Sequence, residues 1–411
     1  MSRSRTILIA GAGIGGLTAA IALAAKGFRI IVLERAERLE QAGAGLQLSP
    51  NASRILIALG VAPHLAPRAI VPDAVSIMSA RTGKRIGRIP LGDQAGGRYG
   101  APYWIVHRAD LQAALVARIR EIPDIELRLG ASFADVTGHA SGVTVTQHAG
   151  DTRQQETALA LIGADGVWSA VRQQVFPKVQ ARFTGRIAWR GTVDADRLPE
   201  DFNRHFDHHG VQLWLGPNAH LVAYPMSGGQ RINVVAISTG SWDRPGWDEA
   251  AEATDIARQF DLGRWPSPAR SLVGSVDSWR RWALFAAESE AGGASEAAWA
   301  SGSIALLGDA AHAMLPFVAQ GAGMAIEDAA VLAGSLAGIT TPNEVPAALA
   351  RYSTLRQARV ARMQRTARRT GQIYHLRGPL AFARDTVIRL LDGERLLARQ
   401  DWIYGWRASV S

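Results

Sequence analysis

Residues 6–16, which read TILIAGAGIGG, decide the fold of this chain. The first five residues have the apolar pattern of a buried strand, and a glycine-rich turn follows at once. A helical run then extends to Gly27, and a second apolar stretch, Phe28–Leu33, ends at Glu34. A strand, a glycine-rich turn, a helix and a second strand that ends in an acid together predict a dinucleotide-binding unit.

The three glycines of the turn have separate tasks in such a unit. Gly11 permits the tight turn, Gly13 lets the backbone approach a pyrophosphate, and Gly16 lets the helix pack closely on the strand. The helix N-terminus offers free N–H groups and the positive end of its dipole to the phosphates. Glu34 lies near the spacing expected for a carboxylate that binds ribose hydroxyls.

The composition of the 411 residues narrows the class of protein. Apolar residues make up 47% and charged residues 20%, which supports a large core or two domains and excludes a disordered chain. The absence of cysteine excludes a disulfide scaffold, a thiolate nucleophile and a thiolate metal site, and it agrees with a reducing, cytoplasmic location. Thr6–Ala25 carries no charge, but the glycine turn inside it argues against a signal peptide or membrane span.

Two further motifs place a carboxylate directly after an apolar strand. Residues 163–172 read GADGVWSAVR and contain Asp165, and residues 308–312 read GDAAH and contain Asp309. Ligands of open α/β sheets bind at the carboxyl ends of strands, where such carboxylates accept hydrogen bonds from ribose or ribityl hydroxyls. Residues 320–324 open a helix whose N-terminus suits an anion or an electron-rich ring edge.

The middle of the chain has a different strand pattern. Val211–Leu215, His220–Pro225 and Arg231–Ser238 are short strands that contain valine, tryptophan or tyrosine, which is typical of a mostly antiparallel sheet. Alternating residues at Ile125–Leu129 and Val143–His148 likewise predict antiparallel strands. The C-terminal part of the chain is helical in pattern and rich in arginine.

Taken together, these motifs resemble the single-component FAD-dependent aromatic hydroxylases, and most of all the salicylate hydroxylase-like and 6-hydroxynicotinate 3-monooxygenase-like branch. Further similar stretches are residues 43–52, 188–191, 220–225 and 401–406, so the likeness covers nearly the whole chain in the same order. The resemblance implies an α/β protein with a Rossmann-type FAD-binding domain, an inserted, mostly antiparallel β-sheet substrate domain and a C-terminal helical segment. These parts would comprise residues 1–73, 100–178 and 276–350, then 74–99 and 179–275, and finally 351–411.

The resemblance also implies which residues hold FAD. The pyrophosphate would lie on the first turn (Gly11, Gly13, Ile14, Gly15 and Gly16), the adenosine ribose on Glu34, and the adenine beside Arg35. Arg108 would contact the ribityl–phosphate region and Asp309 the ribityl hydroxyls, while Gly321, Ala322, Gly323 and Met324 would line the flavin ring. In the family the Asp165 motif is tied both to FAD and to the pyridine nucleotide.

The implied reaction is hydroxylation of an activated aromatic or heteroaromatic ring, such as a phenol or an aromatic acid. NAD(P)H reduces FAD, the reduced flavin and O2 form a C4a-hydroperoxide, and this species transfers one oxygen to the ring. The pocket must exclude water, because the hydroperoxide otherwise loses H2O2. A phenol is attacked best as its phenolate, which requires a nearby base or hydrogen-bond acceptor, and histidine suits this task.

The candidate catalytic residues are His220, Tyr224 and Gln47. His220 and Tyr224 are four residues apart, so on a strand both side chains lie on one face. The resemblance places a catalytic His/Tyr pair here, whereas Gln47 replaces a histidine of the pyridine-hydroxylating branch and argues against a 6-hydroxynicotinate-type substrate. The alternative is a strand histidine satisfied by a backbone group, with Tyr224 as core packing. The substrate and the choice between NADH and NADPH stay open.

Other residues carry weaker signals. The histidines at 205, 208 and 209 cluster with Asp207 but fit a polar loop as well as a metal site, so we predict no metal. His312 is interpreted as structural, and the tryptophans at 189, 214, 279 and 282 as core packing rather than pocket lining. Residues 285–288 read FAAE and lack the Asp-Arg pair usual in the family, which weakens a role of this segment in pyridine-nucleotide handling.

Two classes of alternative function compete with the hydroxylase. One is a flavin oxidase, reductase or halogenase on the same scaffold, although the lysines, only Lys26, Lys84 and Lys178, do not form a halogenase motif. The other is a basic protein that binds nucleic acid or a membrane surface, for which no zinc knuckle, aromatic platform or basic amphipathic anchor is present. We therefore predict a small aromatic substrate, NAD(P)H and O2 as partners, and neither nucleic acid nor membrane.

The formal net charge is +9, and residues 351–384 contain nine arginines without any Asp, Glu or Lys. This segment alone therefore accounts for the net charge of the chain. Val360, Met363 and Ala367 form a narrow apolar stripe when the segment is drawn as a helix. We expect a solvated helix that docks by this stripe and pairs with acidic groups of the body or of a second subunit in a homodimer.

Overall fold

The computed structural model describes residues 5–39, 45–246, 249–260, 264–289 and 299–408. Its first sheet has six strands in the order β18-β19-β11-β1-β2-β7. Their bounds are β1 Thr6–Ala10, β2 Arg29–Glu34, β7 Ile125–Leu129, β11 Ala160–Gly163, β18 Ala300–Ser301 and β19 Ile304–Leu306. The strand β1 is central and pairs in parallel with β2 and β11, and its five residues are buried because both faces of the sheet are covered.

Helices and a small sheet cover the two faces of this parallel sheet. The helices α1 (Ile14–Ala24), α5 (Arg108–Arg120) and α11 (Gly321–Leu336) share one apolar core with it. The three-stranded sheet of β8 (Ala131–His139), β9 (Gly142–Ala149) and β10 (Thr152–Ala158) contributes to the core on the other face. The prediction of antiparallel pairing is confirmed for Val143–His148, which lies in β9, between β8 and β10.

The same prediction is wrong for Ile125–Leu129. This stretch is β7, which pairs in parallel with β2 at the edge of the Rossmann sheet. Both faces of an edge strand are only partly covered, so its residues alternate in polarity as those of an antiparallel strand do. The preceding helix α5 provides the crossover that a parallel connection needs.

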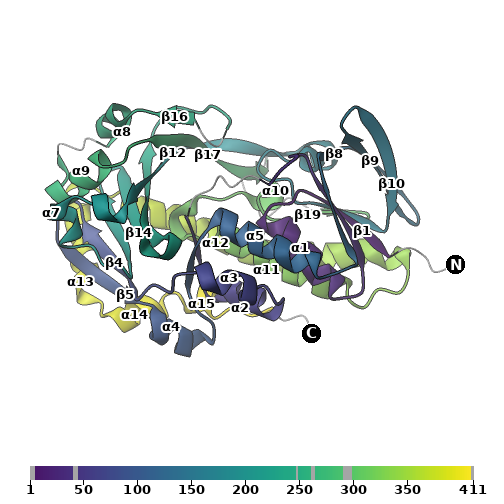
Figure 1. The fold of residues 1–411 in the computed structure, drawn as a ribbon, viewed down its shortest axis with the longest axis horizontal. Helices are drawn as coiled ribbons and strands as arrows, with labels where there is room; N and C mark the ends of the chain where they lie inside the picture. Colours follow the sequence, from purple (N-terminus) through teal and green to yellow (C-terminus); the bar gives the residue numbers. More distant parts are fainter. Residues whose placement is uncertain (1–4, 40–44, 247–248, 261–263, 290–298, 409–411) are drawn as a thin grey trace.

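The second sheet has eight strands in the order β16-β17-β12-β15-β14-β13-β4-β5 and lies at the opposite end of the molecule (Figure 1). Their bounds are β4 Ala74–Ser79, β5 Arg85–Pro90, β12 Val179–Asp194, β13 Val211–Gly216, β14 Ala219–Met226, β15 Arg231–Thr239, β16 Glu249–Ala251 and β17 Trp279–Ser289. All pairs are antiparallel except β13 with β4, so the predicted mostly antiparallel sheet is confirmed. The strand β17 belongs to this sheet, although the predicted substrate segment ends at residue 275.

One face of the eight-stranded sheet carries a separate core. Trp189, Trp214 and Trp279 are almost completely buried there, which confirms core packing for these three tryptophans. Trp282 lies instead under the guanidinium of Arg190, 5.7 Å from the ring centroid. The other face, which carries His220 and Tyr224, is directed toward the body of the protein and toward residues 315–317.

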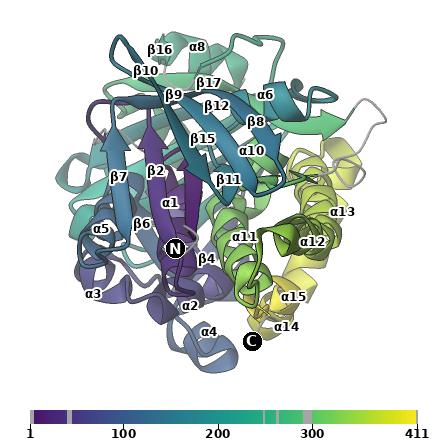
Figure 2. The same ribbon diagram turned by 90° about the vertical axis from the view of Figure 1, so that its right-hand side faces the viewer.

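The C-terminal helices are α12 (Val345–Tyr374), α13 (Gly378–Leu390), α14 (Gly393–Ala398) and α15 (Asp401–Tyr404). Figure 2 shows α12 beside α11. Val360, Met363 and Ala367 are fully buried, so the predicted docking stripe is confirmed. The nine arginines do not form one solvated helix, however, because the chain breaks between α12 and α13 and because Arg356 and Arg384 are buried.

Shorter elements complete the fold. These are β3 Gly45–Leu48, α2 Pro50–Ala58, α3 Ala62–Leu65, η1 Ala66–Arg68, α4 Gly92–Tyr99, β6 Trp104–His107, α6 Ala170–Val175, η2 Ala195–Arg197, α7 Glu200–Asn203, η3 Ser227–Gly229, α8 Ala253–Gln259, α9 Ser267–Gly274, α10 Asp309–His312, η5 Pro316–Val318 and η6 Pro342–Glu344. Among the described residues, every helix is too short or too polar to cross a bilayer.

Candidate active site

The glycine-rich turn connects β1 to α1 and is closed by two tight contacts. Gly11 has φ +107°, and a Cβ placed there would lie 2.5 Å from the Ala164 carbonyl oxygen. A Cβ at Gly16 would lie 2.0 Å from the Gly11 carbonyl oxygen, so α1 approaches the strand end as predicted. A Cβ at Gly13 would meet no atom of the described residues within 4 Å. The turn is therefore packed on its inner side and open at Gly13, the N-cap of α1.

Glu34 closes the second strand against this turn. Its Oε2 accepts a hydrogen bond from the amide of Ala12 at 2.9 Å, and its Oε1 accepts one from the amide of Ala36 at 3.0 Å. Arg35 is exposed next to it. The carboxylate is thus fixed at the end of β2, beside the open side of the glycine-rich turn, where the resemblance implies a ribose.

The Asp165 motif follows β11, the next strand to β1. Its Oδ2 accepts hydrogen bonds from the amides of Ala170 at 2.7 Å and Val171 at 3.2 Å, whereas its Oδ1 is buried without a partner among the described residues. The buried Arg172 donates to the carbonyl oxygens of Val167 and, at 2.8 Å, Ala310. Arg172 therefore ties this motif to the Gly308-Asp309 motif.

Asp309 is the first residue of α10, which follows β19, and it is half-buried. Burial raises the pKa of this carboxyl, and the charges of His312, Arg108 and Arg172 oppose the increase. Arg108 begins α5, so the structure brings this cation into the electrostatic range of Asp309. Within the described part of the chain the carboxylate has no hydrogen-bond partner. The first turn, Asp165 and Asp309 lie at the carboxyl ends of three neighbouring strands, β1, β11 and β19.

The segment from Pro316 to Met324 is the last part of the candidate site and leads into α11. The 3-10 turn η5 leads into Ala319, a non-glycine residue with φ +51°, and α11 begins at Gly321. Such a conformation costs on the order of 1 kcal/mol or more and is typical of functional loops. The first amides of α11 are directed away from the helix, and a Cβ at Gly321 would meet no described atom within 4 Å.

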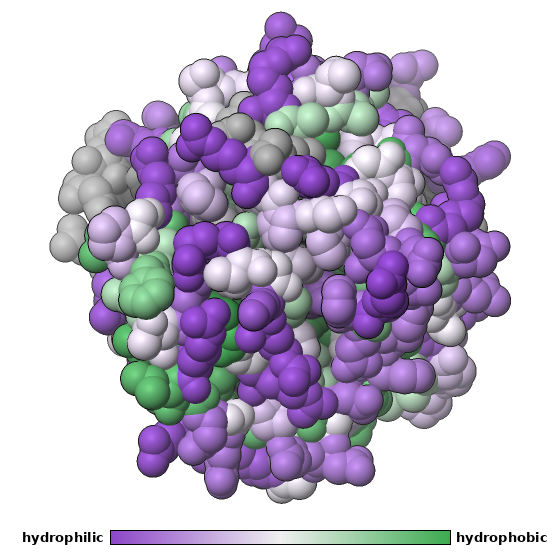
Figure 3. All heavy atoms as spheres, turned by 90° about the vertical axis from the view of Figure 1, so that its left-hand side faces the viewer, coloured by the Kyte–Doolittle hydropathy of each residue, from purple (hydrophilic) through white to green (hydrophobic). Residues whose placement is uncertain are grey.

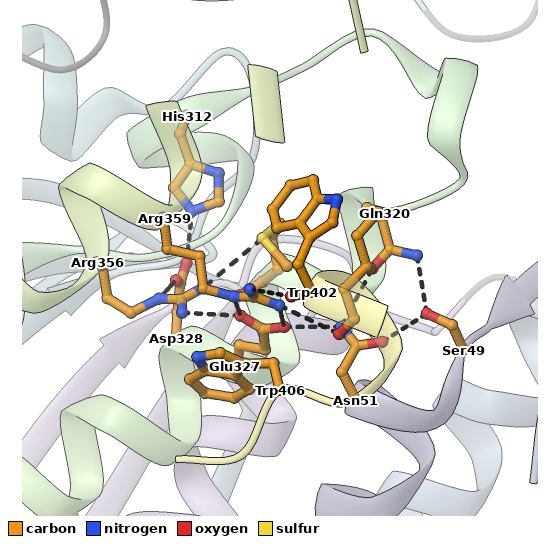
Figure 4. A network of polar contacts seen from close by, with 12 residues as sticks. Ser49, Asn51, His312, Gln320, Glu327, Asp328, Arg356, Arg359, Trp402 and Trp406 are labelled. Carbon is orange, nitrogen blue, oxygen red and sulfur yellow. Dashed lines mark hydrogen bonds and ion pairs between the residues drawn. The ribbon is translucent and has the colours of Figure 1, made fainter. Parts of the chain in front are cut away.

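A buried polar network that the sequence analysis missed supports these turns (Figure 4). On α12, Arg356 donates to Asp328 at 2.6 Å and to Glu327 at 2.8 Å, and Arg359 donates to both oxygens of Glu327 at 2.6 Å. Both guanidinium groups stack on Trp406. Burial raises the pKa of Asp328, but the charges and hydrogen bonds of His312 and Arg356 outweigh burial and lower this pKa to about 2.

The network reaches both the turn before Asp309 and the turn before α11. Asp328 Oδ2 accepts hydrogen bonds from the Gly308 amide at 3.0 Å and from His312 Nε2 at 2.6 Å, which confirms a structural role for His312. Asn51 donates to Glu327 at 2.7 Å and to Gln320, the N-cap of α11, at 3.1 Å. Two adjacent acids in the apolar stretch 321–336, and arginines spaced three apart on α12, were the sequence signals for this network.

His220 and Tyr224 lie on β14, on one face of the eight-stranded sheet, as predicted. His220 Nδ1 lies 2.9 Å from His375 Nε2, so the alternative of a backbone partner for His220 is wrong. Tyr224 donates to the Gly45 carbonyl oxygen at 2.6 Å. The structure therefore ties the two candidate side chains to different partners, His375 after α12 and Gly45 in β3.

Further polar groups surround this face, of which only Gln47 was a candidate from the sequence, whereas Tyr103 and Asn233 were not. Gln47 accepts a hydrogen bond from the Tyr103 hydroxyl at 2.8 Å. Asn233 lies opposite Tyr224 in the sheet and is fully buried, yet neither of its amide atoms has a hydrogen-bond partner of normal geometry among the described residues. Burial raises the pKa of the Tyr224 phenol, and Arg190 and Asn233 lower it by less.

Three further stretches that the sequence singled out are residues 43–52, the histidine cluster at 205–209 and the segment at 285–288. Residues 43–44 of the second glycine-rich stretch lie outside the described residues. His208 pairs with Asn203 at 2.7 Å, and Asp207 accepts from the backbone of His209. The segment around Phe285 is a strand, part of β17, and Phe285 packs edge-on against Trp168 with ring centroids 4.7 Å apart.

The α/β domain with its glycine-rich first turn has the architecture of a dinucleotide-binding protein, and it is joined to a separate, mostly antiparallel sheet. A family model described as an FAD binding domain matches residues 4–367, and the chain belongs to this family. It is 36% identical to a 3-hydroxybenzoate 6-hydroxylase of Polaromonas naphthalenivorans (strain CJ2) over 400 residues, 97% of this chain and 96% of the relative. It is also 36% identical to a 3-amino-4-hydroxybenzoate 2-monooxygenase of Streptomyces platensis over 405 residues, 98% and 96% of the two chains.

The solved structure of a salicylate hydroxylase substrate complex superposes with a TM-score of 0.83 at 25% identity, and the match covers 99% of this chain and 97% of that chain. These similarities confirm the predicted family and fold class. The chain is an FAD-dependent aromatic hydroxylase.

Proposed function

We propose that this enzyme hydroxylates a hydroxybenzoate-type aromatic acid and that FAD lies along the carboxyl ends of β1, β11 and β19. The groups available there suit this cofactor. The open side of Gly13 and the N-terminus of α1 favour a pyrophosphate, and Glu34 favours a ribose. The unpartnered Oδ1 of Asp165 and the carboxylate of Asp309 are acceptors for hydroxyl groups of the cofactor or of the pyridine nucleotide.

The flavin ring would lie against the turn of residues 321–324, whose amides are directed outward. Bound FAD would supply the redox chemistry, which is the acceptance of hydride from NAD(P)H and the activation of O2. Phe317, in the turn just before α11, packs on His220 with ring centroids 5.2 Å apart. This contact is the single observation that carries the substrate assignment, because it connects the flavin-side turn with the polar face of β14.

The side chains on that face would bind the substrate and keep water away. His220 would contact the phenolic oxygen, while Gln47 and Tyr103 would bind a polar substituent. Tyr224 would keep β14 and β3 together through Gly45. Burial lowers the pKa of His220 well below its usual range, with His375 and Arg186 adding to the effect, so the ring is neutral at physiological pH. Two relatives named for hydroxybenzoates support this substrate class.

The experiment is a substrate panel with two readouts. Salicylate, 3-hydroxybenzoate, 4-hydroxybenzoate, 3-amino-4-hydroxybenzoate and 6-hydroxynicotinate are each tested for stimulation of NADH and NADPH oxidation and for product mass under labelled O2. We expect a hydroxybenzoate to stimulate turnover and to gain one oxygen atom from O2. Stimulated oxidation that yields only H2O2 with every compound would identify a flavin oxidase instead.

A variant tests the role of His220. We expect His220→Ala to bind FAD normally but to divert most NAD(P)H oxidation to H2O2, because the phenolic oxygen has lost its partner. His208→Ala removes an exposed histidine of the same sheet region and is the matched control. Unchanged coupling of NAD(P)H oxidation to product in His220→Ala would remove His220 from the mechanism.

The proposal includes a homodimer in the cytoplasm. The helix α13 exposes large apolar side chains at the end of the molecule shown in Figure 3, where apolar residues gather among polar ones. These residues are Leu380, Phe382, Val387 and Leu390, of which Leu390 is 75% exposed. We expect sedimentation equilibrium to give a dimer, which Phe382→Glu converts to a monomer, whereas Ile57→Glu on α2 leaves it intact. A wild-type monomer at micromolar concentration would contradict this part.

A further inference from the structure

A chain of three polar side chains extends from the candidate active site toward the surface. His220 Nδ1 lies 2.9 Å from His375 Nε2, and His375 Nδ1 lies 3.0 Å from Nη1 of Arg186 on β12. Both histidines are almost fully buried, at 3% and 7% exposure. The chain joins β14, the residue after α12 and β12, so it exists only in the folded protein.

Arg186 fixes the direction of both hydrogen bonds among Arg186, His375 and His220. A guanidinium has only donors, so His375 Nδ1 must accept from Arg186 and carries no hydrogen. A neutral His375 then carries its hydrogen on Nε2 and donates it to His220 Nδ1. A neutral His220 that accepts on Nδ1 must in turn carry its own hydrogen on Nε2.

The surroundings of the two rings keep them neutral. The neighbouring rings are Phe317 and Tyr374, and the charged groups that act on His375 are Arg186 on β12 and Arg384 on α13. Arg384 is itself paired with Asp385. Burial, followed by these two cations, lowers the pKa of His375 to about 3. A second proton, which would place a hydrogen on the ring nitrogen that accepts from its neighbour and so break that hydrogen bond, is therefore not taken up near neutral pH.

The free ring nitrogen of His220, Nε2, is the atom of this hydrogen-bonded series that would contact a substrate. Nε2 has no hydrogen-bond partner among the described residues, and the ring packs on Phe317 in the flavin-side turn. A hydrogen on this atom makes it a donor. It then stabilises a phenolate oxygen through a charge-assisted hydrogen bond but has no lone pair with which to take the proton of a phenol.

We propose that Arg186 and His375 are positioning residues that hold His220 in the tautomer with hydrogen on Nε2, so that His220 binds the substrate oxygen as a hydrogen-bond donor and not as a base. The proposal rests on the proposed function, which places an aromatic substrate beside His220. It assigns a role to Arg186 and His375, which belong to no sequence motif and lie 34 and 155 positions from His220.

The direct test determines the tautomer in the FAD-loaded enzyme without turnover. Histidine labelled with nitrogen-15 gives distinct NMR signals for ring nitrogens with and without hydrogen, and the His220→Gln and His375→Gln variants assign the two rings. We expect hydrogen on Nε2 of both rings, unchanged across neutral pH. Hydrogen on Nδ1 of His220 would overturn the proposal whatever the activity.

A second test uses a coloured phenol, 3-hydroxy-4-nitrobenzoate, whose ionisation is followed by absorbance on the oxidised enzyme. We expect Arg186→Met and His375→Leu to raise the apparent pKa of the bound phenol by about one unit, since they release the donor tautomer. FAD content should stay unchanged. Arg186→Lys retains a donor, and His375→Gln retains both an acceptor and a donor, so both should restore the wild-type value.

Arg182 lines the same surface groove as Arg186 without contacting either histidine, so Arg182→Met is the matched control. A bound phenol pKa that is identical in Arg186→Met and wild type would overturn the positioning role. If the wild type hydroxylates no aromatic acid, the proposed function fails instead, and the NMR experiment still decides the tautomer. The two failures are therefore distinguishable.

Discussion

Two sets of carboxylates in this enzyme have opposite surroundings: Glu327 and Asp328 are fully buried, whereas Asp165 and Asp309 are half-buried after the ends of β11 and β19. Glu327 and Asp328 on α11 accept hydrogen bonds from Arg356 and Arg359, from backbone and from other side chains. Asp165 has one buried oxygen without a hydrogen-bond partner among the described residues, and the half-buried Asp309 carboxylate makes no hydrogen bond within the same part of the chain. Buried polar atoms are normally hydrogen-bonded, so the orphaned oxygen of Asp165 indicates ligand binding, whereas the fully paired Glu327 and Asp328 indicate a contribution to stability.

The two sets are nevertheless connected. Asp328 binds the Gly308 amide, directly before Asp309, and Glu327 is linked through Asn51 to the N-cap residue of α11. The satisfied network thus supports the turns where we propose that FAD binds. Changes in the first set should lower stability and changes in the second set should lower FAD affinity, and this separation can be tested.

The largest effect is expected from Arg356→Met. It leaves Asp328 and Glu327 buried with fewer cationic partners, and breaking such a pair costs about 3–5 kcal/mol. Urea unfolding of the holoenzyme, followed by circular dichroism, measures this loss. Arg351→Met, on an exposed arginine of the same helix, should change the free energy of unfolding by less than about 0.5 kcal/mol. Equal effects of the two variants would contradict a structural role for the network.

The next effect is on binding. Asp309→Asn should weaken FAD binding about 10- to 100-fold, since it removes a charged acceptor worth about 1.5–3 kcal/mol. The stability of the cofactor-free protein should stay equal or increase, because the carboxylate is half-buried there without a partner. Titration of the cofactor-free variant with FAD, followed by quenching of flavin fluorescence, gives the affinity. Asp277→Asn, in an exposed pair with Arg197, is the control, and a wild-type affinity of Asp309→Asn would remove Asp309 from the site.

The pH dependence of stability should have opposite signs at the two carboxylates. The pKa of Asp328 is lowered to about 2 in the folded state, so its contribution of about 2 kcal/mol is complete above pH 4 and is lost as the pH falls toward 2. Burial raises the pKa of Asp309, so its ionised form destabilises the cofactor-free protein at high pH, and this cost disappears as the pH falls.

Unfolding of wild type, Asp328→Asn and Asp309→Asn between pH 3 and 7 separates these contributions. The stability difference between wild type and Asp328→Asn should shrink below about pH 4. The advantage of Asp309→Asn over the cofactor-free wild type should shrink with acidification as well. A pH-independent difference for Asp328→Asn would show that packing, and not its charge, stabilises the fold.

The smallest effect on stability is expected at an exposed arginine of α12 that pairs with none of these carboxylates. Arg362 is exposed on α12 and lies 4.0 Å from the centroid of Trp402, so Arg362→Ala should cost about 0.5–1 kcal/mol. The same urea measurement detects it, and the double variant with Trp402→Ala should show non-additive losses. A loss as large as that of Arg356→Met would mean that exposed and buried arginines of α12 contribute alike.

Local patterns were sufficient to predict which glycines and carboxylates lie at the carboxyl ends of the strands. The strand, the glycine turn and the acid follow one another within residues 6–34. Asp165 and Asp309 each follow a strand directly, and the parallel pairing of β1, β11 and β19 brings these strand ends to one edge of the sheet. The partners of His220 and Asn51 could not be predicted in this way. His375 and Glu327 are separated from them by 155 and 276 residues, and no spacing rule covers such contacts.

The sequence by itself determined that the chain contains a dinucleotide-binding unit and a mostly antiparallel sheet, because both depend on short-range patterns of apolar residues and glycine. Which arginines of the C-terminal segment are buried, and which carboxylates they pair with, was decided only by the tertiary structure. A count of charges cannot tell whether an arginine is exposed or buried, since burial depends on which distant carboxylate it meets. Arg356 and Arg359 of α12 pair with Glu327 and Asp328 inside the protein, so part of a segment that appeared in the sequence as one charged helix supports the turns before Asp309 and α11.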